Sequence, residues 1–203
     1  MKKDLKFCFG AMGCGKTRKL QGDYYSKIED GFEVIIMKPS IDKKAEDNTL
    51  ARDGEKIKTT FLIYPDTNIY VLIAKYLLER NLDFILIDEA QFLKEEQVEQ
   101  LSDIVDILGI NVICYGLRTD FRGELFPGSK RLLEMADPIE SITRQCSCGN
   151  NKTYNMRLVN KIPSFEGEQI AIDGIEATYE SMCRKCYKDI KKKILSKAKI
   201  KNS

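Results

Sequence analysis

The chain has 203 residues, of which 43% are hydrophobic and 32% charged, with a formal net charge of +2. This length allows one domain, or one domain with a small module, and the balanced charge does not call for a nucleic-acid partner. The absence of histidine excludes His-dependent nucleophile triads and His-ligated metals. A proton acceptor must then be a carboxylate, Lys, Tyr or Cys, and zinc would be held by thiolates, with or without a carboxylate.

The sequence carries no membrane or secretion signal that we recognise. No apolar run approaches the roughly 18 residues that a membrane span needs. The opening MKKDLKFCFG runs directly into a glycine-rich motif instead of a signal-peptide cleavage site. An odd number of cysteines, seven, also fits poorly with a disulfide framework. We therefore expect a cytoplasmic protein with reduced thiols and no membrane partner.

Short apolar runs alternate with helical patterns along the first two thirds of the chain. The runs predict buried strands at Lys6–Phe9, Val34–Met37, Phe84–Ile87, Val112–Tyr115 and Ile139–Thr143. Helical patterns cover about Lys16–Asp30, Ile69–Arg80 and Lys94–Leu108, and residues 39–56 are polar and predict a long loop. Buried strands separated by helices indicate an α/β domain whose parallel sheet is covered on both faces, with the ligand beyond the carboxyl ends of the strands.

The pattern changes after about Thr143. Cysteines occur in pairs, and short β-like runs appear at Tyr154–Val159 and Gln169–Ile172. The stretch from Lys188 onwards carries seven Lys, which predicts a solvated, fraying helix end. We therefore divide the chain into an α/β domain at residues 1–143, a small module at 144–190 and a basic, mobile tail at 191–203.

A glycine-rich motif, GAMGCGKT, lies between the first predicted strand and the first predicted helix. It fits the pattern G-x-x-x-x-G-K-[ST], in which glycines let backbone N–H groups surround a phosphate at the start of a helix. In this pattern Lys16 neutralises the β- and γ-phosphates and the Thr17 hydroxyl binds Mg²⁺. The predicted nucleotide-binding residues are Gly10, Ala11, Met12, Gly13, Cys14, Gly15, Lys16 and Thr17.

Two carboxylates, Asp88 and Glu89, follow the predicted strand Phe84–Ile87. The strand would place them at its carboxyl end, level with the glycine-rich motif. One acid can hold Mg²⁺ and the other can orient or deprotonate a nucleophile. If Glu89 activates water, the protein is an NTPase, and if it activates a substrate hydroxyl, the protein is a kinase. These two motifs leave that choice open.

Four of the seven cysteines form two close pairs, Cys146-x-Cys148 and Cys183-x-x-Cys186. Two such pairs at the ends of a β-rich segment are typical of a structural zinc site with four thiolate ligands. A closed site of this kind leaves no coordination position for a substrate. Zinc would therefore stabilise the folded module and take no part in the chemistry.

Together these motifs resemble the type II thymidine kinase family over about Leu5–Tyr187. The resemblance rests on GAMGCGKT at 10–17, DEAQF at 88–92, GLRTDF at 116–121 with Phe126, EGEQI at 166–170 and YESMCRKCY at 179–187. It implies a P-loop NTPase (RecA-like) parallel sheet with a small C-terminal zinc-binding lasso domain. It also implies transfer of the γ-phosphoryl group of ATP to the 5′-hydroxyl of thymidine, and of deoxyuridine as well.

The resemblance also implies roles for individual residues. Glu89 corresponds to the catalytic base, Arg52 to an arginine near the transferring phosphate, and Asp88 with Thr17 to the Mg²⁺ side of the site. The nucleotide site extends to Ala90 and Gln91. The residues matched to the thymidine site are Met12, Phe92, Leu117, Phe121, Phe126, Ile172, Gly174 and Tyr179.

The stretch from about Lys161 to Thr178 matches a lasso loop that closes over the nucleoside and holds it largely by main-chain hydrogen bonds. Here Asp173-Gly174-Ile175 replaces the Ile-Gly-Gly that is common in the family, and the first cysteine pair has one intervening residue where many members have two. The resemblance further implies ATP, Mg²⁺ and structural Zn²⁺ as cofactors, dTTP as a feedback ligand, and a homotetramer or homodimer.

Two other functions stay open from the residues alone. A P-loop ATPase could carry a zinc ribbon that binds nucleic acid, although the balanced charge and the lack of a basic-aromatic pattern argue against it. A kinase with another acceptor, such as a purine nucleoside or a nucleotide, is excluded only by the family resemblance. We expect thymidine and ATP as the partners and no nucleic acid.

Overall fold

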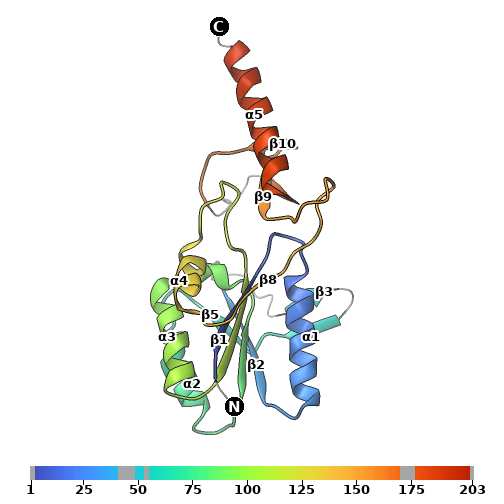
Figure 1. Ribbon diagram of the computed structural model, residues 1–203. Helices are drawn as coiled ribbons and strands as arrows, with labels where there is room; N and C mark the ends of the chain where they lie inside the picture. Colours follow the sequence, from blue (N-terminus) through green and yellow to red (C-terminus); the bar gives the residue numbers. More distant parts are fainter. Residues whose placement is uncertain (1–2, 41–48, 53–54, 170–176, 202–203) are drawn as a thin grey trace.

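The computed structural model describes residues 3–40, 49–52, 55–169 and 177–201. Its main sheet has six strands: β1 (Leu5–Phe9), β2 (Val34–Pro39), β5 (Phe61–Ile63), β6 (Phe84–Ile87), β7 (Asn111–Gly116) and β8 (Ile139–Ser141). They lie in the order β5-β2-β6-β7-β1-β8 and every neighbouring pair is parallel (Figure 1). The predicted parallel sheet, including the strand near residue 139, is therefore confirmed.

Helices cover both faces of this sheet, as predicted. Helix α1 (Lys16–Glu29) lies on one face, and α2 (Ile69–Tyr76), α3 (Glu95–Asp106) and α4 (Pro127–Met135) lie on the other (Figure 1). The pleat of each strand sends successive side chains to opposite faces. On β1, for example, Phe7 joins the core under α2, α3 and α4, whereas Cys8 joins the core under α1.

The prediction of a loop over residues 39–56 was wrong for part of that segment. Strands β3 (Thr49–Arg52) and β4 (Glu55–Lys58) pair as an antiparallel ribbon, while residues 41–48 and 53–54 lie outside the described ranges. Leu50 and Ile57 form the one pair in this register in which both residues are large and aliphatic. Backbone pairing therefore builds the ribbon without the apolar run by which the other strands were recognised.

The structure also contains two elements that were not predicted, and one helix ends earlier than expected. The unpredicted elements are β5, which has only three residues, and α4, which begins at Pro127. The helix predicted over Ile69–Arg80 ends at Tyr76, because Leu78 and Glu79 donate to carbonyls three residues earlier, at 3.2 and 3.3 Å, and tighten the last turn. None of the helices within the described ranges is long and apolar enough to cross a membrane.

A second, antiparallel sheet follows the main one. Strands β9 (Tyr154–Val159), β10 (Ile162–Ser164) and β11 (Ala177–Met182) pair in the order β10-β9-β11. Gln169, predicted to start a strand, lies in a bend, and residues 170–172 fall outside the described ranges. A small core forms beneath β9 and contains Met156, Met182 and Tyr187 beside the paired cysteines.

Helix α5 (Arg184–Lys201) closes the described chain and extends away from the main sheet (Figure 1). Its backbone continues through most of the segment predicted to be a mobile tail, so a boundary after residue 190 falls inside a helix. The division into 1–143, 144–190 and 191–203 stays a prediction.

The topology brings the motifs to one edge of the main sheet. Strands β1, β6 and β7 are parallel neighbours, with β7 between the other two. Their carboxyl ends lead to Gly10, Asp88 and Leu117 respectively. Because parallel strands end at the same edge, the glycine-rich motif, the acidic pair and the GLRTDF segment meet there.

Candidate active site

The glycine-rich motif at residues 10–17 forms a tight loop between β1 and α1. Gly15 has a φ of 101°, which L-residues with a side chain rarely adopt. A Cβ at Gly10 would lie 2.4 Å from the carbonyl oxygen of Ile142, so the loop packs too closely for any larger residue. The side chain of Lys16 is buried, and its Nζ donates to the carbonyls of Gly10 (3.3 Å) and Ala11 (3.1 Å). The ammonium group is thus held over the loop.

Asp88 lies at the carboxyl end of β6 and is 4% exposed. Burial raises the pKa of this carboxyl group to about 6, and the neighbouring negative charge of Glu89 contributes in the same direction. Its Oδ1 is buried and has no hydrogen-bond partner within the described residues. A buried carboxylate oxygen of this kind suits a hard divalent cation, so the Asp88 side chain fits a Mg²⁺ ligand.

Glu89 has a φ of 52°, an uncommon backbone conformation for a residue with a side chain. Such conformations concentrate at functional sites, where the surrounding structure maintains them. The Glu89 carboxylate accepts a hydrogen bond from Gln91 Nε2 at 2.5 Å. Gln91 is 1% exposed, and its Oε1 accepts from the backbone N–H of Leu117 at 2.9 Å. Gln91 therefore fixes the Glu89 side chain relative to the segment after β7.

Gln91 and Ala90 were predicted to belong to the nucleotide site. They lie in the short 3-10 helix η1 (Ala90–Phe92), and both are buried. The Gln91 amide is occupied by protein groups on both sides, which favours a positioning role over direct contact with ATP. Arg52 lies at the end of β3, and its side chain is outside the described part of the structure.

A cavity of about 130 Å³ lies next to these groups. It brings together six of the eight residues that were matched to the thymidine site, namely Met12, Phe92, Leu117, Phe121, Phe126 and Tyr179. The rings of Phe92 and Phe126 meet edge to face, with 5.6 Å between their centroids. Ile172 and Gly174 lie outside the described ranges. An adjoining cavity of about 300 Å³ shares Phe92 and Phe126 with the first.

Sequence reasoning missed three polar residues that also line the smaller cavity: Asp120, Asn155 and Gln169. Asn155 is 3% exposed and lies on β9, a segment that the sequence predicted as a β-like run without assigning a role to its polar residues. Its Oδ1 accepts from the backbone N–H of Met12 at 2.8 Å, and its Nδ2 donates to the carbonyl of Thr119 at 3.4 Å. Asn155 therefore joins β9 to the glycine-rich loop and to the segment after β7.

Asp120 holds the segment after β7 together. Its carboxylate accepts backbone N–H bonds from Arg122 (2.8 Å) and Glu124 (3.0 Å), and it forms an ion pair with the Arg122 guanidinium at 2.8 Å. Gln169 also reaches this carboxylate, with its Nε2 at 3.3 Å from Asp120 Oδ2. Asp120 thereby joins the cavity wall to the chain that follows β10.

The four paired cysteines converge as predicted. Their Sγ atoms all lie within 4.8 Å of one another, with 3.9 Å between Cys146 and Cys186 and 3.4 Å between Cys148 and Cys183. A tetrahedral zinc ion with Zn–S bonds of about 2.3 Å needs sulfurs roughly 3.8 Å apart, so the cluster fits zinc.

The pKa shifts of the cysteine thiols are also consistent with a metal site. A backbone N–H hydrogen bond from Cys148, together with one from Cys183, lowers the pKa of the Cys146 thiol. Hydrogen bonds with the neighbouring sulfurs raise the pKa of Cys186. The fold therefore favours thiolates at this position but opposes four negative charges together, and a divalent cation removes that conflict.

Comparison with known proteins gives a consistent result. The family model described as "Thymidine kinase" matches residues 3–187. A protein named thymidine kinase from Legionella pneumophila (strain Paris) is 40% identical over 186 residues, covering 91% of this chain and 88% of its own. A solved DNA replication initiation factor aligns with a TM-score of 0.38 and 16% identity over 69% of this chain and 40% of its own, which is too weak a likeness to inform the fold.

Two other relatives are similar over nearly their whole length. The thymidine kinase of Shewanella oneidensis is 40% identical over 187 residues, covering 91% of this chain and 96% of its own. The thymidine kinase of Enterobacteria phage T4 is 38% identical over 192 residues, covering 94% of this chain and 98% of its own. The range matched by the family model, residues 3–187, includes the glycine-rich loop, the acidic pair and both cysteine pairs.

Proposed function

This chain belongs to the thymidine kinase family and is an ATP-dependent nucleoside kinase that phosphorylates thymidine, and we propose that Glu89 is the general base of its reaction. The observation that carries this proposal is the chain of hydrogen bonds from Glu89 through Gln91 to Leu117. Leu117 lines the cavity, so a carboxylate is held at a fixed position relative to the place where a nucleoside would bind. Geometric control of this kind is what general-base catalysis requires.

In the proposed step, Glu89 accepts the proton of the thymidine 5′-hydroxyl while that oxygen forms a bond to the γ-phosphorus of ATP. The bond between the γ-phosphorus and the β–γ bridging oxygen breaks, which gives dTMP and ADP. Phosphoryl transfer depends on positioning and charge neutralisation more than on covalent catalysis. One carboxylate and a cationic phosphate site are therefore sufficient, and the chain needs no histidine.

The phosphates of ATP are assigned to the glycine-rich loop. Lys16 is held over that loop by the carbonyls of Gly10 and Ala11, and its ammonium group is placed to neutralise the transferring phosphoryl group. The start of α1 adds the positive end of the helix dipole. Asp88 and Thr17 would hold Mg²⁺, which when bound supplies further charge neutralisation at the β- and γ-phosphates. We also assign Arg52 to the transferring phosphate.

We assign the thymine base to the 130 Å³ cavity. Its walls combine Phe121, Phe126 and Tyr179 with Met12 and Leu117, which suits a flat ring. Phe92 completes this wall, and Ile172 and Gly174 remain proposed contacts beyond the described ranges. The closeness of the cavity to the phosphate loop keeps the two substrates within reach of one another.

The test is an ATP/Mg²⁺ phosphoryl-transfer assay across a panel of nucleosides. Thymidine and deoxyuridine should yield the 5′-monophosphates, and purine nucleosides should not react. ATP hydrolysis without any nucleotide product would contradict the proposal and favour an ATPase. Salt-sensitive binding to single-stranded DNA in a filter assay would favour the nucleic-acid alternative.

The finer properties implied by the resemblance are also proposals. We infer that dTTP binds with its thymine in the nucleoside cavity and its phosphates at the glycine-rich loop, so it should compete with both substrates. We propose a homodimer or homotetramer, which sedimentation velocity would test. We also propose that the protein is located in the cytoplasm, where the cysteines that would bind zinc stay reduced.

A further inference from the structure

One buried arginine has no part in the chemistry described above. Arg157 lies at the centre of β9 and is 8% exposed. It stands opposite Ser164 of β10 and Tyr179 of β11 in the antiparallel register, so the three side chains share one face of the small sheet. Tyr179 lines the nucleoside cavity, but Arg157 does not. The arginine therefore lies just behind the cavity wall.

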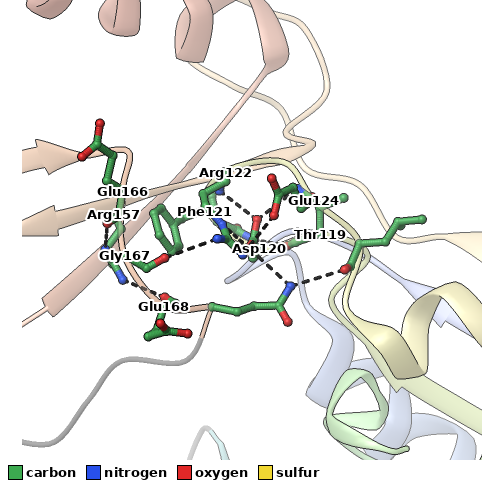
Figure 2. Close-up of polar contacts among 12 residues, drawn as sticks. Thr119, Asp120, Phe121, Arg122, Glu124, Arg157, Glu166, Gly167 and Glu168 are labelled. Atoms are coloured by element: carbon green, nitrogen blue, oxygen red, sulfur yellow. Dashed lines mark hydrogen bonds and ion pairs between the residues drawn. The ribbon is translucent and has the colours of Figure 1, made fainter. Parts of the chain in front are cut away.

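The guanidinium of Arg157 binds the chain that follows β10, which we call the entry segment (residues 164–169). Nη1 donates to the carbonyl oxygen of Glu168 at 3.1 Å, and Nη2 donates to that of Glu166 and to Ser164 Oγ, the latter at 3.4 Å. Figure 2 shows the guanidinium beside this segment, with Gly167 between the two bonded carbonyls. The contacts with Glu166 and Glu168 are made to their backbone carbonyls, so they do not depend on the exposed side chains of these two residues.

Arg157 also contacts the cavity wall itself. Its Cζ lies 3.7 Å from the ring centroid of Phe121, a fully buried residue that lines the cavity. A cation over a desolvated aromatic ring is an attractive arrangement. Within the described residues, the partners of Arg157 are carbonyl and hydroxyl oxygens and this ring, and none is a carboxylate. Its charge is thus used to join the Phe121 ring to the entry segment.

The entry segment reaches the cavity at Gln169. This side chain lines the cavity and donates from Nε2 to Asp120 Oδ2 and to the carbonyl of Leu125, each at 3.3 Å. Only glycine fits well at position 167, because its φ is 110° and a Cβ there would lie 2.7 Å from Arg157 Nη2. The segment is therefore fitted to the guanidinium on one side and to the cavity on the other.

We propose that Arg157 is a positioning residue for nucleoside binding, which holds the entry segment and the Phe121 ring in the arrangement that the nucleoside requires. This inference rests on the proposed function, because it assumes that the cavity binds thymidine. It predicts a defect in nucleoside affinity and not in phosphoryl transfer. Removal of the guanidinium lets the entry segment move, and the nucleoside must then order that segment when it binds.

The test compares Arg157→Met and Arg157→Lys with the wild-type enzyme. Arg157→Met keeps the aliphatic stem but removes every donor, and we expect the KM for thymidine to rise about tenfold or more, as loss of charged hydrogen bonds implies. The kcat should change by less than about threefold, and the KM for ATP should stay near the wild-type value. Arg157→Lys should restore part of the affinity, because an ammonium cannot bond to both carbonyls in the fork geometry of a guanidinium.

A second variant tests the same contact from the other side. Gly167→Ala should raise the KM for thymidine, because the new Cβ would clash with Nη2 and because a φ of 110° is unfavourable for Ala. In the Arg157→Met background the part of the effect caused by the clash should be lost, and the part caused by backbone strain should remain. Hydrogen exchange of the backbone amides at 164–169 should be faster in Arg157→Met. Arg131→Met serves as the matched control, since Arg131 lies on α4 and pairs with Glu99 and Glu134 away from the cavity.

Several outcomes would overturn the proposal. One is a cooperatively folding Arg157→Met protein whose KM for thymidine is within about twofold of wild type. Another is an equal rise in the KM for ATP, which indicates a general structural defect. If Arg157→Met does not fold, Arg157→Lys and Gly167→Ala decide, and an unchanged KM for thymidine in both contradicts the proposal. A wild-type enzyme that fails to phosphorylate thymidine would instead refute the proposed function.

Discussion

Asn155 Oδ1 accepts a hydrogen bond from the backbone N–H of Met12 at 2.8 Å, across 143 residues of sequence. This contact joins strand β9 to the glycine-rich loop. The same amide donates from Nδ2 to the carbonyl of Thr119, in the segment that walls the nucleoside cavity. A single buried side chain therefore connects the proposed phosphate site with the proposed thymine site.

Replacing Asn155 with Ala should weaken binding of both substrates. The change leaves the Met12 N–H and the Thr119 carbonyl without their partner, and an unsatisfied buried polar group costs about 1–3 kcal/mol. We expect the KM values for ATP and thymidine each to rise roughly tenfold, since about 1.4 kcal/mol corresponds to that factor. Steady-state kinetics with each substrate varied in turn provides the measurement. Asn151→Ala, an exposed site in the same module, is the control, and equal kinetics in the two variants would refute the linking role.

Replacing Glu89 with Gln should abolish turnover while preserving binding. Glutamine keeps the size of the side chain but cannot accept the proton of the 5′-hydroxyl, so kcat should fall by about 10²–10⁴-fold. The dissociation constants for ATP and thymidine, measured by calorimetry, should remain near those of the wild type. Glu96→Gln on the exposed surface of α3 should have no effect. Near-normal kcat in Glu89→Gln would show that another group is the base.

Short sequence patterns predicted those strands and helices whose own residues carry a clear apolar run or a helical period. The run Phe84–Ile87 is buried at all four positions, and its apolar letters identify it as a strand without further information. The β3–β4 ribbon could not be found in this way, because cross-strand backbone pairing forms it and most of its residues are polar. Strand β5 depends likewise on a neighbour, β2, to which its three residues pair.

The residues of the candidate site also fall into two groups: those that a contiguous motif identifies, and those that only the tertiary structure brings together. The phosphate loop and the acidic pair are contiguous motifs whose spacing indicates their chemistry. Asp120 lies after β7, whereas Asn155 and Arg157 lie on β9, and each looks like an ordinary surface residue until the two sheets are packed together. Their burial is a property of the tertiary structure, and a single sequence carries little signal for it. The pairing of Glu89 with Gln91 is local, yet the motif alone did not show which atoms would meet.

Loss of one zinc ligand should destabilise the C-terminal module and leave the main sheet folded. Cys148 is the exposed member of the cluster, so Cys148→Ser removes a ligand with little change in packing. We expect about one zinc ion per chain in the wild type and clearly less in the variant, since four thiolates close a structural site. The variant and the chelated wild type should both lose thymidine binding, because β9 and β11 carry residues of the cavity wall.

Cys8→Ala is the control for this experiment, because Cys8 lies in the main sheet away from the cluster. It should retain zinc and thymidine binding. Metal analysis, circular dichroism and calorimetric titration with thymidine distinguish the two variants. A Cys148→Ser protein with full zinc content and normal thymidine affinity would contradict the assignment of the cluster.

Two thiols buried in the main sheet should make the fold less stable at alkaline pH. Cys8 on β1 and Cys114 on β7 are fully buried, and burial raises the pKa of Cys8 from 9.0 to about 12 and also raises that of Cys114. Above about pH 9 the unfolded chain loses these protons while the folded chain keeps them. The unfolded state then binds fewer protons, so the free energy of unfolding falls as the pH rises, by about 1.4 kcal/mol per pH unit for each thiol. This loss continues until the pH reaches the raised pKa of the folded state.

Urea titrations of the zinc-saturated, reduced protein between about pH 8 and pH 10 measure how steeply the free energy of unfolding falls with pH, and Cys8→Ala should show a shallower slope. Identical slopes in the wild type and in Cys8→Ala would mean that Cys8 ionises as readily in the folded chain as in the unfolded one.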